Sequence, residues 1–549
     1  MLKANFVAGW VIGGLIVGLT ACVLPLISKP GVDHLKMVNH FVVIYQENHS
    51  FDNLYGGWER VNGLGNADTE HTIQISQDGT ALRCLPQNDP NLRSPPLPVT
   101  CKDSWHGITS AFDNRPFRID TYIPATANTC KNGASGGCTA DMVHKFYQSQ
   151  YQINGGRMNR FVAGSDAAGM PMGYYDTKHL PIYRYLHSLN HPHYAILDNF
   201  FQAAFGGSFI NHQWLIAAKT PIFEGAGQNA QDDFHSQVDS NGMPTGYPFY
   251  TPKGDVKDAE LTASCSDANI KILGLACGDF VINAIQPWYQ PHAPDIHNRR
   301  LPPLKMTNIG AALSAANIDW AWYGGGWSNA DGDAGEPGWT NGNGTRCSDP
   351  NANPQANYPH CPDKLFQFHH QPFNYYAAFD PASETGRANR KAHLKDEAEF
   401  TALAKASKTV CRLKAVSFVK PIGAENEHPG YASEYQGNDH LVELIRNIEN
   451  SVCANDTMII VTYDEFGGQW DHVSPPDWEN DIGPHDQWGP GTRIPALVLA
   501  PFLQTEFAVD HTPYDTTSIL ATIERRYGLN PLGSRDAIIN DLSNIFEAR

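Results

Sequence analysis

TMIIVTYDEFGGQWDHVSPP, residues 457–476, passes within one residue from an apolar run to a group of polar side chains. The run at 458–462 has no solvent side, so it predicts a strand buried on both faces of a sheet. Asp464 and Glu465 follow it and lead into a Gly-Gly turn. Ligands bind at the carboxyl ends of strands in open α/β sheets, and paired carboxylates there suit a hard cation. A solvated acidic turn is the alternative for this stretch alone.

A second stretch repeats the same arrangement. Residues 41–46, FVVIYQ, form another buried-strand run, and Glu47 and Asn48 follow it directly. A cation held by oxygen atoms from two strand ends needs carboxylate and carbonyl donors at both ends. We therefore predict that Glu47, Asn48, Asp464 and Glu465 meet at one edge of a sheet.

A third junction places a hydroxyl group after two glycines. The strand-like run HYAILD at 193–198 is followed by Gly206, Gly207 and Ser208, and then by the helical pattern FINHQWLIAA. Glycines let the backbone approach an anion, and a helix N-terminus offers unpaired N–H groups. This pattern is typical of a nucleophile or a phosphate site. Ser208 as a helix N-cap is a compatible alternative.

The rest of the chain alternates strand and helix patterns. Further strands are expected at 319–325, 415–420 and 494–500, and helices at 180–189, 309–316, 440–451 and 518–527. Such alternation predicts an α/β fold with a mostly parallel central sheet and helices on both faces. Asp141 is expected to be the N-cap of another helix, with His144 in its first turn.

The chain is long enough for two or three domains, but we predict one catalytic domain over 38–549. Segments of about 57–137, 221–290 and 324–362, rich in Gly, Pro and Asn, are expected to be loop insertions. The 39 basic and 57 acidic residues give a net charge of −18. This balance argues against a nucleic-acid surface and against a polybasic membrane patch.

The N-terminal segment 1–29 has the pattern of an export signal. Lys3 precedes an apolar stretch at 6–27, and a membrane anchor is the alternative for so long a stretch. Within it, Leu19-Thr20-Ala21-Cys22 resembles the lipobox of bacterial lipoproteins, in which the cysteine is lipidated. We expect a periplasmic or outer-envelope protein that contacts the membrane only through this segment, or else a secreted protein.

Cysteine spacing supports export. Of the eleven cysteines, ten remain when Cys22 is set aside, and disulfides persist in oxidising compartments. Spacing does not determine connectivity. Proximity suggests five pairs: Cys84 with Cys101, Cys130 with Cys138, Cys265 with Cys277, Cys347 with Cys361, and Cys411 with Cys453.

Two further stretches contain histidines in polar surroundings. His369 and His370 lie in the sequence FHHQPF, and because adjacent side chains on a strand point in opposite directions, at least one is expected to meet solvent or ligand. His428 follows the strand expected at 415–420. It is therefore placed at the same sheet edge as the acids.

With these stretches, the chain resembles the bacterial phosphoesterase family that contains phospholipases C and acid phosphatases, whose fold is similar to that of alkaline phosphatase. The resemblance runs from about residue 40 to 530. Seven ordered blocks carry it: ENHSFDNLYG (47–56), DMVHKFYQSQYQINGGRMNRFV (141–162), MGYYDTKHLP (172–181), DNFFQAAFGGSFINH (198–212), NEHPG (426–430), TYDEFGGQWDHVSPP (462–476) and GPGTRIPALVLAP (489–501).

The resemblance implies one divalent metal ion and a set of site residues. The metal ligands fall on Glu47, Asn48, Ser208, Asp464 and Glu465, and the catalytic histidines on His144, His428, His369, His370 and His472. Many phospholipases of the family have threonine at the position of Ser208, so the serine and the HHQPF stretch are more similar to the acid-phosphatase branch. Oxygen ligands alone do not distinguish Mg, Ca, Mn, Zn and Fe.

The expected activity is hydrolysis of phosphate monoesters by an acid phosphatase, with Ser208 as nucleophile and a phosphoserine intermediate. The need for a protonated imidazole favours activity below about pH 6.5. A phospholipase C acting on choline-type lipids is the main alternative, and a non-catalytic envelope protein is a remote one. Oligomeric state stays open.

Overall fold

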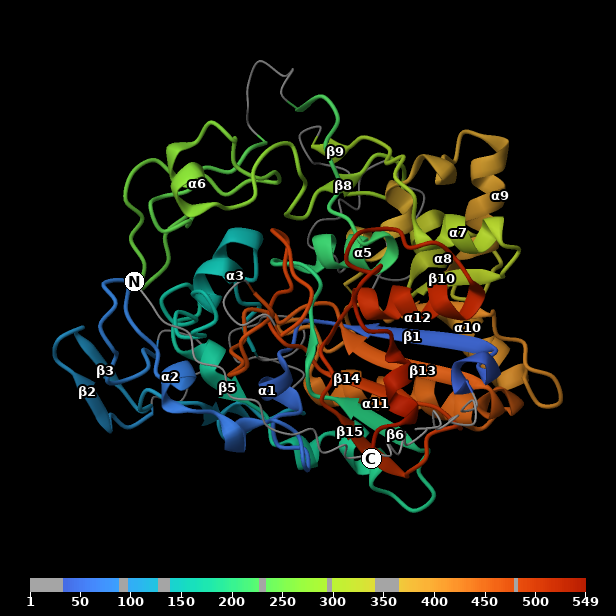
Figure 1. Cartoon of the computed structure of the whole chain (residues 1–549), viewed down its shortest axis with the longest axis horizontal. Coiled ribbons are helices and arrows are strands. Elements are labelled where there is room, and N and C mark those ends of the chain that lie inside the picture. Colours follow the sequence, from blue (N-terminus) through green and yellow to red (C-terminus); the bar gives the residue numbers. More distant parts are fainter. Residues whose placement is uncertain are drawn as a thin grey trace, which may run out of the picture. The chain divides into compact units, whose positions relative to one another are not determined.

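The computed structural model describes residues 33–87, 97–126, 139–226, 234–293, 299–340, 365–477 and 482–549. Its centre is an eight-stranded sheet with the order β11-β10-β12-β1-β13-β14-β6-β15 (Figure 1). Neighbouring strands are parallel except where β14 pairs with β13 and β6. The predicted mostly parallel sheet is therefore confirmed. Its strands are β1 (His40–Gln46), β6 (Tyr194–Leu197), β10 (Trp320–Gly324), β11 (Leu394–Asp396), β12 (Val416–Lys420), β13 (Thr457–Tyr463), β14 (Ala496–Leu499) and β15 (Phe507–Asp510).

The apolar runs form the middle of this sheet. Every residue of β13 is buried, as are six of the seven residues of β1. The two strands pair in parallel from His40 opposite Thr457 to Gln46 opposite Tyr463. Strand β12 lies on the other side of β1. The carboxyl ends of all three strands therefore meet at one edge.

Helices cover both faces of the sheet (Figure 1). Helices α5, α7 and α12 form one contact group, and α4, α10 and α11 form another. These helices are α4 (Pro181–Leu186), α5 (Ser208–Ala217), α7 (Ile309–Ala315), α10 (Glu397–Ala406), α11 (Glu434–Glu449) and α12 (Thr517–Tyr527). The remaining elements include α1 (Phe51–Leu54), α2 (Thr69–Thr72), α3 (Phe146–Ile153), α6 (Ala268–Leu273), α8 (Trp327–Asp331), α9 (Glu384–His393), β2 (Cys101–Asp103), β3 (Ile108–Ser110), β4 (Phe117–Arg118), β5 (Gly173–Tyr174), β7 (Phe200–Phe201), β8 (Gln286–Pro287), β9 (Arg300–Leu301) and β16 (Tyr514–Asp515).

The helix expected to begin at Asp141 begins later. Helix α3 starts at Phe146, with Lys145 in the N-cap position and no side-chain cap. The N-cap prediction for Asp141 is therefore wrong. The chain before α3 is not helical, because this segment lies against the carboxyl edge of the sheet, as described below.

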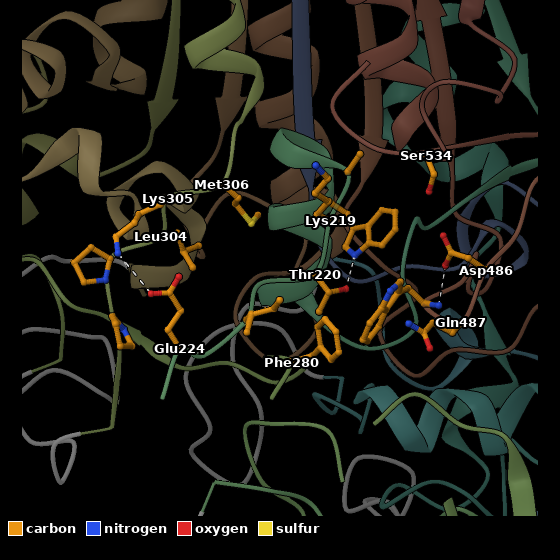
Figure 2. Close-up of a pocket in the computed structure, with 16 residues that line it drawn as sticks. Lys219, Thr220, Glu224, Phe280, Leu304, Lys305, Met306, Asp486, Gln487 and Ser534 are labelled. Atoms are coloured by element: carbon orange, nitrogen blue, oxygen red, sulfur yellow. Dashed lines mark hydrogen bonds and ion pairs between the residues drawn. The ribbon is translucent and has the colours of Figure 1, made fainter. Parts of the chain in front are cut away.

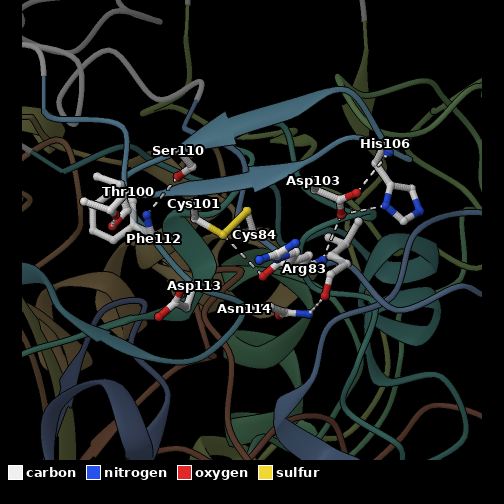
Figure 3. Close-up of a disulfide and its surroundings, with 12 residues drawn as sticks. Arg83, Cys84, Thr100, Cys101, Asp103, His106, Ser110, Phe112, Asp113 and Asn114 are labelled. Carbon is white, nitrogen blue, oxygen red and sulfur yellow. Dashed lines mark hydrogen bonds and ion pairs between the residues drawn. A yellow bond between two sulfur atoms is a disulfide. The ribbon is translucent and has the colours of Figure 1, made fainter.

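Three of the five predicted disulfides are present: Cys84–Cys101, Cys265–Cys277 and Cys411–Cys453. Figure 3 shows the first, which ties the segment before the hairpin β2–β3 to its first strand. The other two predicted pairs (Cys130–Cys138 and Cys347–Cys361) and Cys22, with the rest of the segment predicted to be an export signal, lie outside the described residues. Within the described ranges, no helix has the length and apolar character needed to span a membrane.

Candidate active site

The register between β1 and β13 brings the two predicted acidic junctions together. Both the Asn48 and the Glu465 backbone N–H groups donate to Asp464 Oδ1, at 3.2 and 2.8 Å. Glu47 and Asp464 are fully buried. The sheet thus places all four predicted oxygen donors at one strand edge, with Asn48 held at φ 62°, a left-handed conformation that asparagine tolerates better than most residues.

Ser208 joins this edge from the neighbouring helix. It is the first residue of α5, and Gly207 occupies the N-cap position, so the alternative that Ser208 is the N-cap is wrong. The Ser208 hydroxyl donates to Glu47 Oε2 at 3.2 Å. The helix N-terminus, with its unpaired N–H groups, therefore lies next to the acidic cluster.

The segment before α3 packs closely on the turn after β13, and this contact brings His144 next to the acidic cluster. Gly468 has φ +74°, and a Cβ there would lie 2.5 Å from the Val143 carbonyl oxygen. Only glycine fits at that distance, so the turn after β13 can pack directly on the segment before α3. His144 Nε2 then lies 3.5 Å from Glu465 Oε1.

Three other predicted histidines line one small cavity with Ser208 and His144. The cavity holds about 230 Å³ and is also lined by His369, His370 and His428. His428 Nε2 lies 3.1 Å from Asn48 Nδ2, and His370 Nε2 lies 3.1 Å from Glu47 Oε1. His369 and His370 are on a 3₁₀ turn, Phe368–His370, rather than on a strand. Both can therefore face the same cavity.

His472 has different partners. Its Nδ1 lies 2.6 Å from Asp52 Oδ2, and its Nε2 lies 3.1 Å from Asn62 Oδ1. Asp52 and Asp471 both pair with the fully buried Arg493. The contacts of His472 thus belong to a buried ion-pair network that fastens α1 to the loop after β13.

Two residues of the site escaped the sequence prediction. Lys420, the last residue of β12, is buried, and its Nζ contacts Glu47 Oε1 and donates to the Tyr45 carbonyl at 3.0 Å. His212, one turn after Ser208 in α5, lies with Nδ1 2.7 Å from the Ser208 carbonyl oxygen and 3.8 Å from Asp464 Oδ2. The sequence contained two signals for these residues. One was a lysine at the end of a buried strand, and the other was a histidine four residues after a candidate nucleophile.

The buried carboxylates of the site need a positive charge close to them. Burial and the neighbouring Asp464 carboxylate raise the pKa values of both Glu47 and Glu465 well above the ordinary range. Burial, followed by the charge of Lys420, lowers the pKa of His369 to about 3. Carboxylates that repel one another in a buried cluster need a cation to remain ionised together.

The residues present fit a metal ion. Several buried polar atoms of the cluster have no hydrogen-bond partner among the described residues: Asn48 Oδ1, Asp464 Oδ2, Glu465 Oε1 and His212 Nε2. Buried polar atoms are normally paired. Glu47, His212 and His370 also offer ligand atoms within 4.8 Å of one another. The site therefore offers carboxylate and amide oxygens with imidazoles beside them, and these groups fit a metal ion. This mixture of ligands does not identify the metal.

A second, larger cavity lies at the other end of α5 (Figure 2). It holds about 680 Å³. Trp214 in the last turn of α5 and Thr220 just beyond that helix contribute to its wall, as do Phe280 and Leu304. Ser208 and this cavity thus occupy opposite ends of one helix.

Comparisons with known proteins find phospholipases C among the relatives of this chain. Phospholipase C A of Mycobacterium tuberculosis is 22% identical over 557 residues, which cover 95% of this chain and 80% of that protein. Phospholipase C B of the same organism is 33% identical over 156 residues, or 25% of this chain and 30% of that protein. Non-specific phospholipase C6 of Arabidopsis thaliana is 29% identical over 138 residues, 22% of this chain and 26% of that protein.

A sequence model of the phosphoesterase family matches residues 38–530, which include every site residue named above. The chain therefore belongs to the phosphoesterase family and is a hydrolase that acts on phosphoric ester bonds.

Proposed function

We propose that the protein is a metal-dependent acid phosphatase that hydrolyses phosphate monoesters through a phosphoserine intermediate at Ser208. The position of the Ser208 hydroxyl carries this proposal. It lies at the N-terminus of α5, 3.2 Å from a Glu47 oxygen, in a cavity of about 230 Å³ lined by imidazoles. A cavity of that size suits a phosphoryl group better than a whole lipid headgroup with its glyceride.

The chain's own residues supply the groups for phosphoryl transfer. Glu47 orients the Ser208 hydroxyl, and the N–H groups at the start of α5 receive the phosphoryl oxygens. Ser208 Oγ forms the new bond to phosphorus as the bond to the leaving oxygen breaks, and the hydroxyl proton passes to Glu47, which accepts its hydrogen bond. A water molecule then hydrolyses the phosphoserine, which releases phosphate and restores the Ser208 hydroxyl. His144, whose side chain is 18% exposed and lies beside Glu465, is placed to protonate the leaving oxygen at the cavity mouth.

Glu47, Asn48, Asp464 and Glu465 would hold the metal ion, with Ser208 beside it. When bound, the ion supplies a Lewis acid that neutralises charge on phosphoryl oxygens and lowers the pKa of a neighbouring hydroxyl group. Without a bound ion, Lys420 compensates part of the charge of Glu47.

Steady-state kinetics on two chromogenic substrates test the proposal. The purified protein should hydrolyse p-nitrophenyl phosphate near pH 6 faster than p-nitrophenylphosphorylcholine. Ser208→Ala and Asp464→Asn should each lower kcat by at least about 1,000-fold, because the nucleophile and the metal site act as one unit. A quenched reaction should show one phosphoryl group on the peptide that contains Ser208.

Ser266→Ala is the matched control, because Ser266 is exposed and distant in sequence from every site residue. Its kinetics should equal those of the wild type. If Ser208→Ala keeps its turnover, a water molecule attacks phosphorus directly and the phosphoserine step is wrong.

A phospholipase C is the second candidate, and the 680 Å³ cavity of Figure 2 favours it. The acid Glu224 in its wall pairs with Lys305, and Asp486 pairs with Arg535. Lys219 is a further charged residue in the wall, but most of the wall is apolar surface, and acyl chains bind to such surface. The relatives named above are phospholipases C, in agreement with this reading.

Ile222→Asp separates the two candidates. Ile222 lines that cavity with 51% of its surface exposed, so the variant should fold. If lipids bind there, the variant should lose hydrolysis of phosphatidylcholine vesicles and keep hydrolysis of p-nitrophenyl phosphate. Equal effects on both substrates, or none, would leave the monoesterase as the better description.

We also infer that the protein acts outside the cytosol. Three disulfides support this inference, because such bridges persist in oxidising compartments. Fractionation of cells that produce the wild-type chain and Cys22→Ser tests both export and lipid anchoring.

A further inference from the structure

A second group of metal-ligand side chains lies outside the active site. It consists of Glu397 at the start of α10, Glu425 in the loop after β12, and His440 in α11. His440 Nε2 lies 2.5 Å from Glu397 Oε1 and 3.9 Å from Glu425 Oε2. Each residue offers one ligand atom within 4.8 Å of the other two. Three separate segments thus converge on one point.

Only one of the two oxygens of the buried Glu397 carboxylate has a hydrogen-bond partner among the described residues. Its side chain is 7% exposed, and its Oε2 has no hydrogen-bond partner among the described residues. A buried polar atom without a partner is rare, because its desolvation is not compensated. The unpaired oxygen belongs to the same carboxylate that contacts His440. It is therefore available to a ligand held at the junction of the three segments.

The charges around His440 also leave room for a cation. The charged groups that act on this imidazole are Glu397, Glu425 and Glu443, all of them acidic. Glu443 pairs with Lys405, while the single imidazole of His440 lies against both Glu397 and Glu425. A divalent ion would balance the two glutamates that lie within ligand distance.

The cluster around His472 gives the contrast. Asp52, Asp471 and His472 also gather ligand atoms within 4.8 Å. There, however, the guanidinium of Arg493 and backbone N–H groups engage both oxygens of each aspartate. That cluster already holds its cation, as an arginine, whereas the junction at His440 has an unused carboxylate oxygen.

We propose that Glu397, Glu425 and His440 bind a structural divalent transition-metal ion of the zinc type. One imidazole and two carboxylates are ligands that zinc accepts at about 2 Å, with water in the fourth position. The side chains of His440 and Glu425 are 19% and 26% exposed, which leaves a path for the ion and that water.

The ion would fasten the loop that carries His428. Glu425 lies three residues before His428, and Glu427, between them, already accepts hydrogen bonds from Gln46 and Asn438. Binding at Glu425 adds a third fixed point between this loop, α10 and α11. The site thereby stabilises the folded protein at a distance from the reacting phosphate, and its existence does not depend on the proposed phosphatase activity.

Native mass spectrometry of chelator-treated protein titrated with ZnCl₂ tests the site. His440→Gln and Glu397→Gln should each hold one zinc ion fewer than the wild type, whatever number the active site binds. Glu443→Gln is the matched control, because this glutamate is exposed and pairs with Lys405 outside the ligand set. It should bind the wild-type number.

A second readout does not depend on variants. Wild-type crystals soaked in zinc and measured at the zinc absorption edge should show an anomalous peak between His440 Nε2 and Glu397. Zinc should also raise the Tm of the wild type and of Glu443→Gln more than that of His440→Gln. Equal zinc counts in the wild type and His440→Gln, or no anomalous peak at His440, would show that these residues form only an ion pair.

Discussion

Lys420 shows how one side chain keeps the acidic site foldable. Burying the Glu47 carboxylate without a counter-charge costs several kcal/mol, and here the ammonium group of Lys420 contacts Glu47 directly. The same Nζ also donates to the carbonyls of Tyr45 and Gln46 at the end of β1. Lys420 therefore supplies a built-in positive charge next to the Glu47 carboxylate.

Lys420→Met should destabilise the metal-free protein. Removing one partner of a buried pair leaves Glu47 uncompensated, so the free energy of unfolding should fall by on the order of 3 kcal/mol. Urea unfolding of chelator-treated protein measures this change. Lys305→Met, which removes an ion pair with both side chains 74% exposed, should change it by less than about 0.5 kcal/mol. Equal midpoints for the two variants would contradict the role given to Lys420.

Glu524, in α12 and away from the active site, should make stability depend on pH. Burial, with the Asp536 carboxylate beside it, raises the pKa of Glu524 to about 8. A folded-state pKa above the unfolded value means that this residue's contribution to stability is complete below about pH 4.5 and is lost as pH rises through 8.

Glu524→Gln should therefore be more stable than the wild type at alkaline pH. The gain should be on the order of 3 kcal/mol at pH 9 and much smaller at pH 5, because glutamine stays neutral at both. Urea unfolding at the two pH values gives both numbers. Glu547→Gln, at an exposed position, should show no such pH dependence. A gain that is the same at both pH values would exclude titration of Glu524 as its cause.

At the scale of elements, the site depends on loops that approach one another closely at the ends of β1, β12 and β13. The Glu47 N–H group donates to the Asn426 carbonyl at 3.0 Å, which joins the loops after β1 and β12. Gly468 lets the turn after β13 contact the segment that carries His144. The geometry of the candidate catalytic groups is therefore set by backbone contacts between loops.

Gly468→Ala tests that dependence. The added methyl group would lie 2.5 Å from the Val143 carbonyl oxygen, so His144 must move and kcat should fall by about 100-fold or more. Gly107→Ala has a similar positive φ, +67°, but its methyl group meets nothing within 4 Å. It should lose about 1–2 kcal/mol of stability through backbone strain and keep wild-type kcat. Equal kcat values would mean that the contact does not position His144.

These junctions also explain what could be predicted from the sequence. The runs that became β1 and β13 are continuous, apolar and β-branched, and the carboxyl-edge rule then places their acids together. Strand β11 was missed because its three residues, LKD, carry no periodic signal. His212 was missed because it lies inside the apolar helical run of α5, where its contact with Ser208 is made by tertiary folding.

At the scale of the whole molecule, a net charge of −18 opposes an anionic substrate. The candidate active-site cavity does little to reverse this field, because Lys145 in its wall pairs with Asp258 at 3.0 Å. Capture therefore depends on short-range groups inside the cavity, while the long-range field repels phosphate dianions. Salt screens the short-range attraction inside the cavity only slightly, but it strongly screens the long-range repulsion of the dianion.

Salt should consequently speed capture of a monoester. Raising ionic strength from about 10 mM to about 150 mM shortens the Debye length from about 30 to about 8 Å, so kcat/KM for p-nitrophenyl phosphate should rise several-fold. The zwitterionic p-nitrophenylphosphorylcholine has no net charge to repel, and its kcat/KM should stay constant, which controls for effects of salt on the enzyme itself. A fall in kcat/KM for the dianion alone would show that local positive charge at the cavity outweighs the field of the molecule.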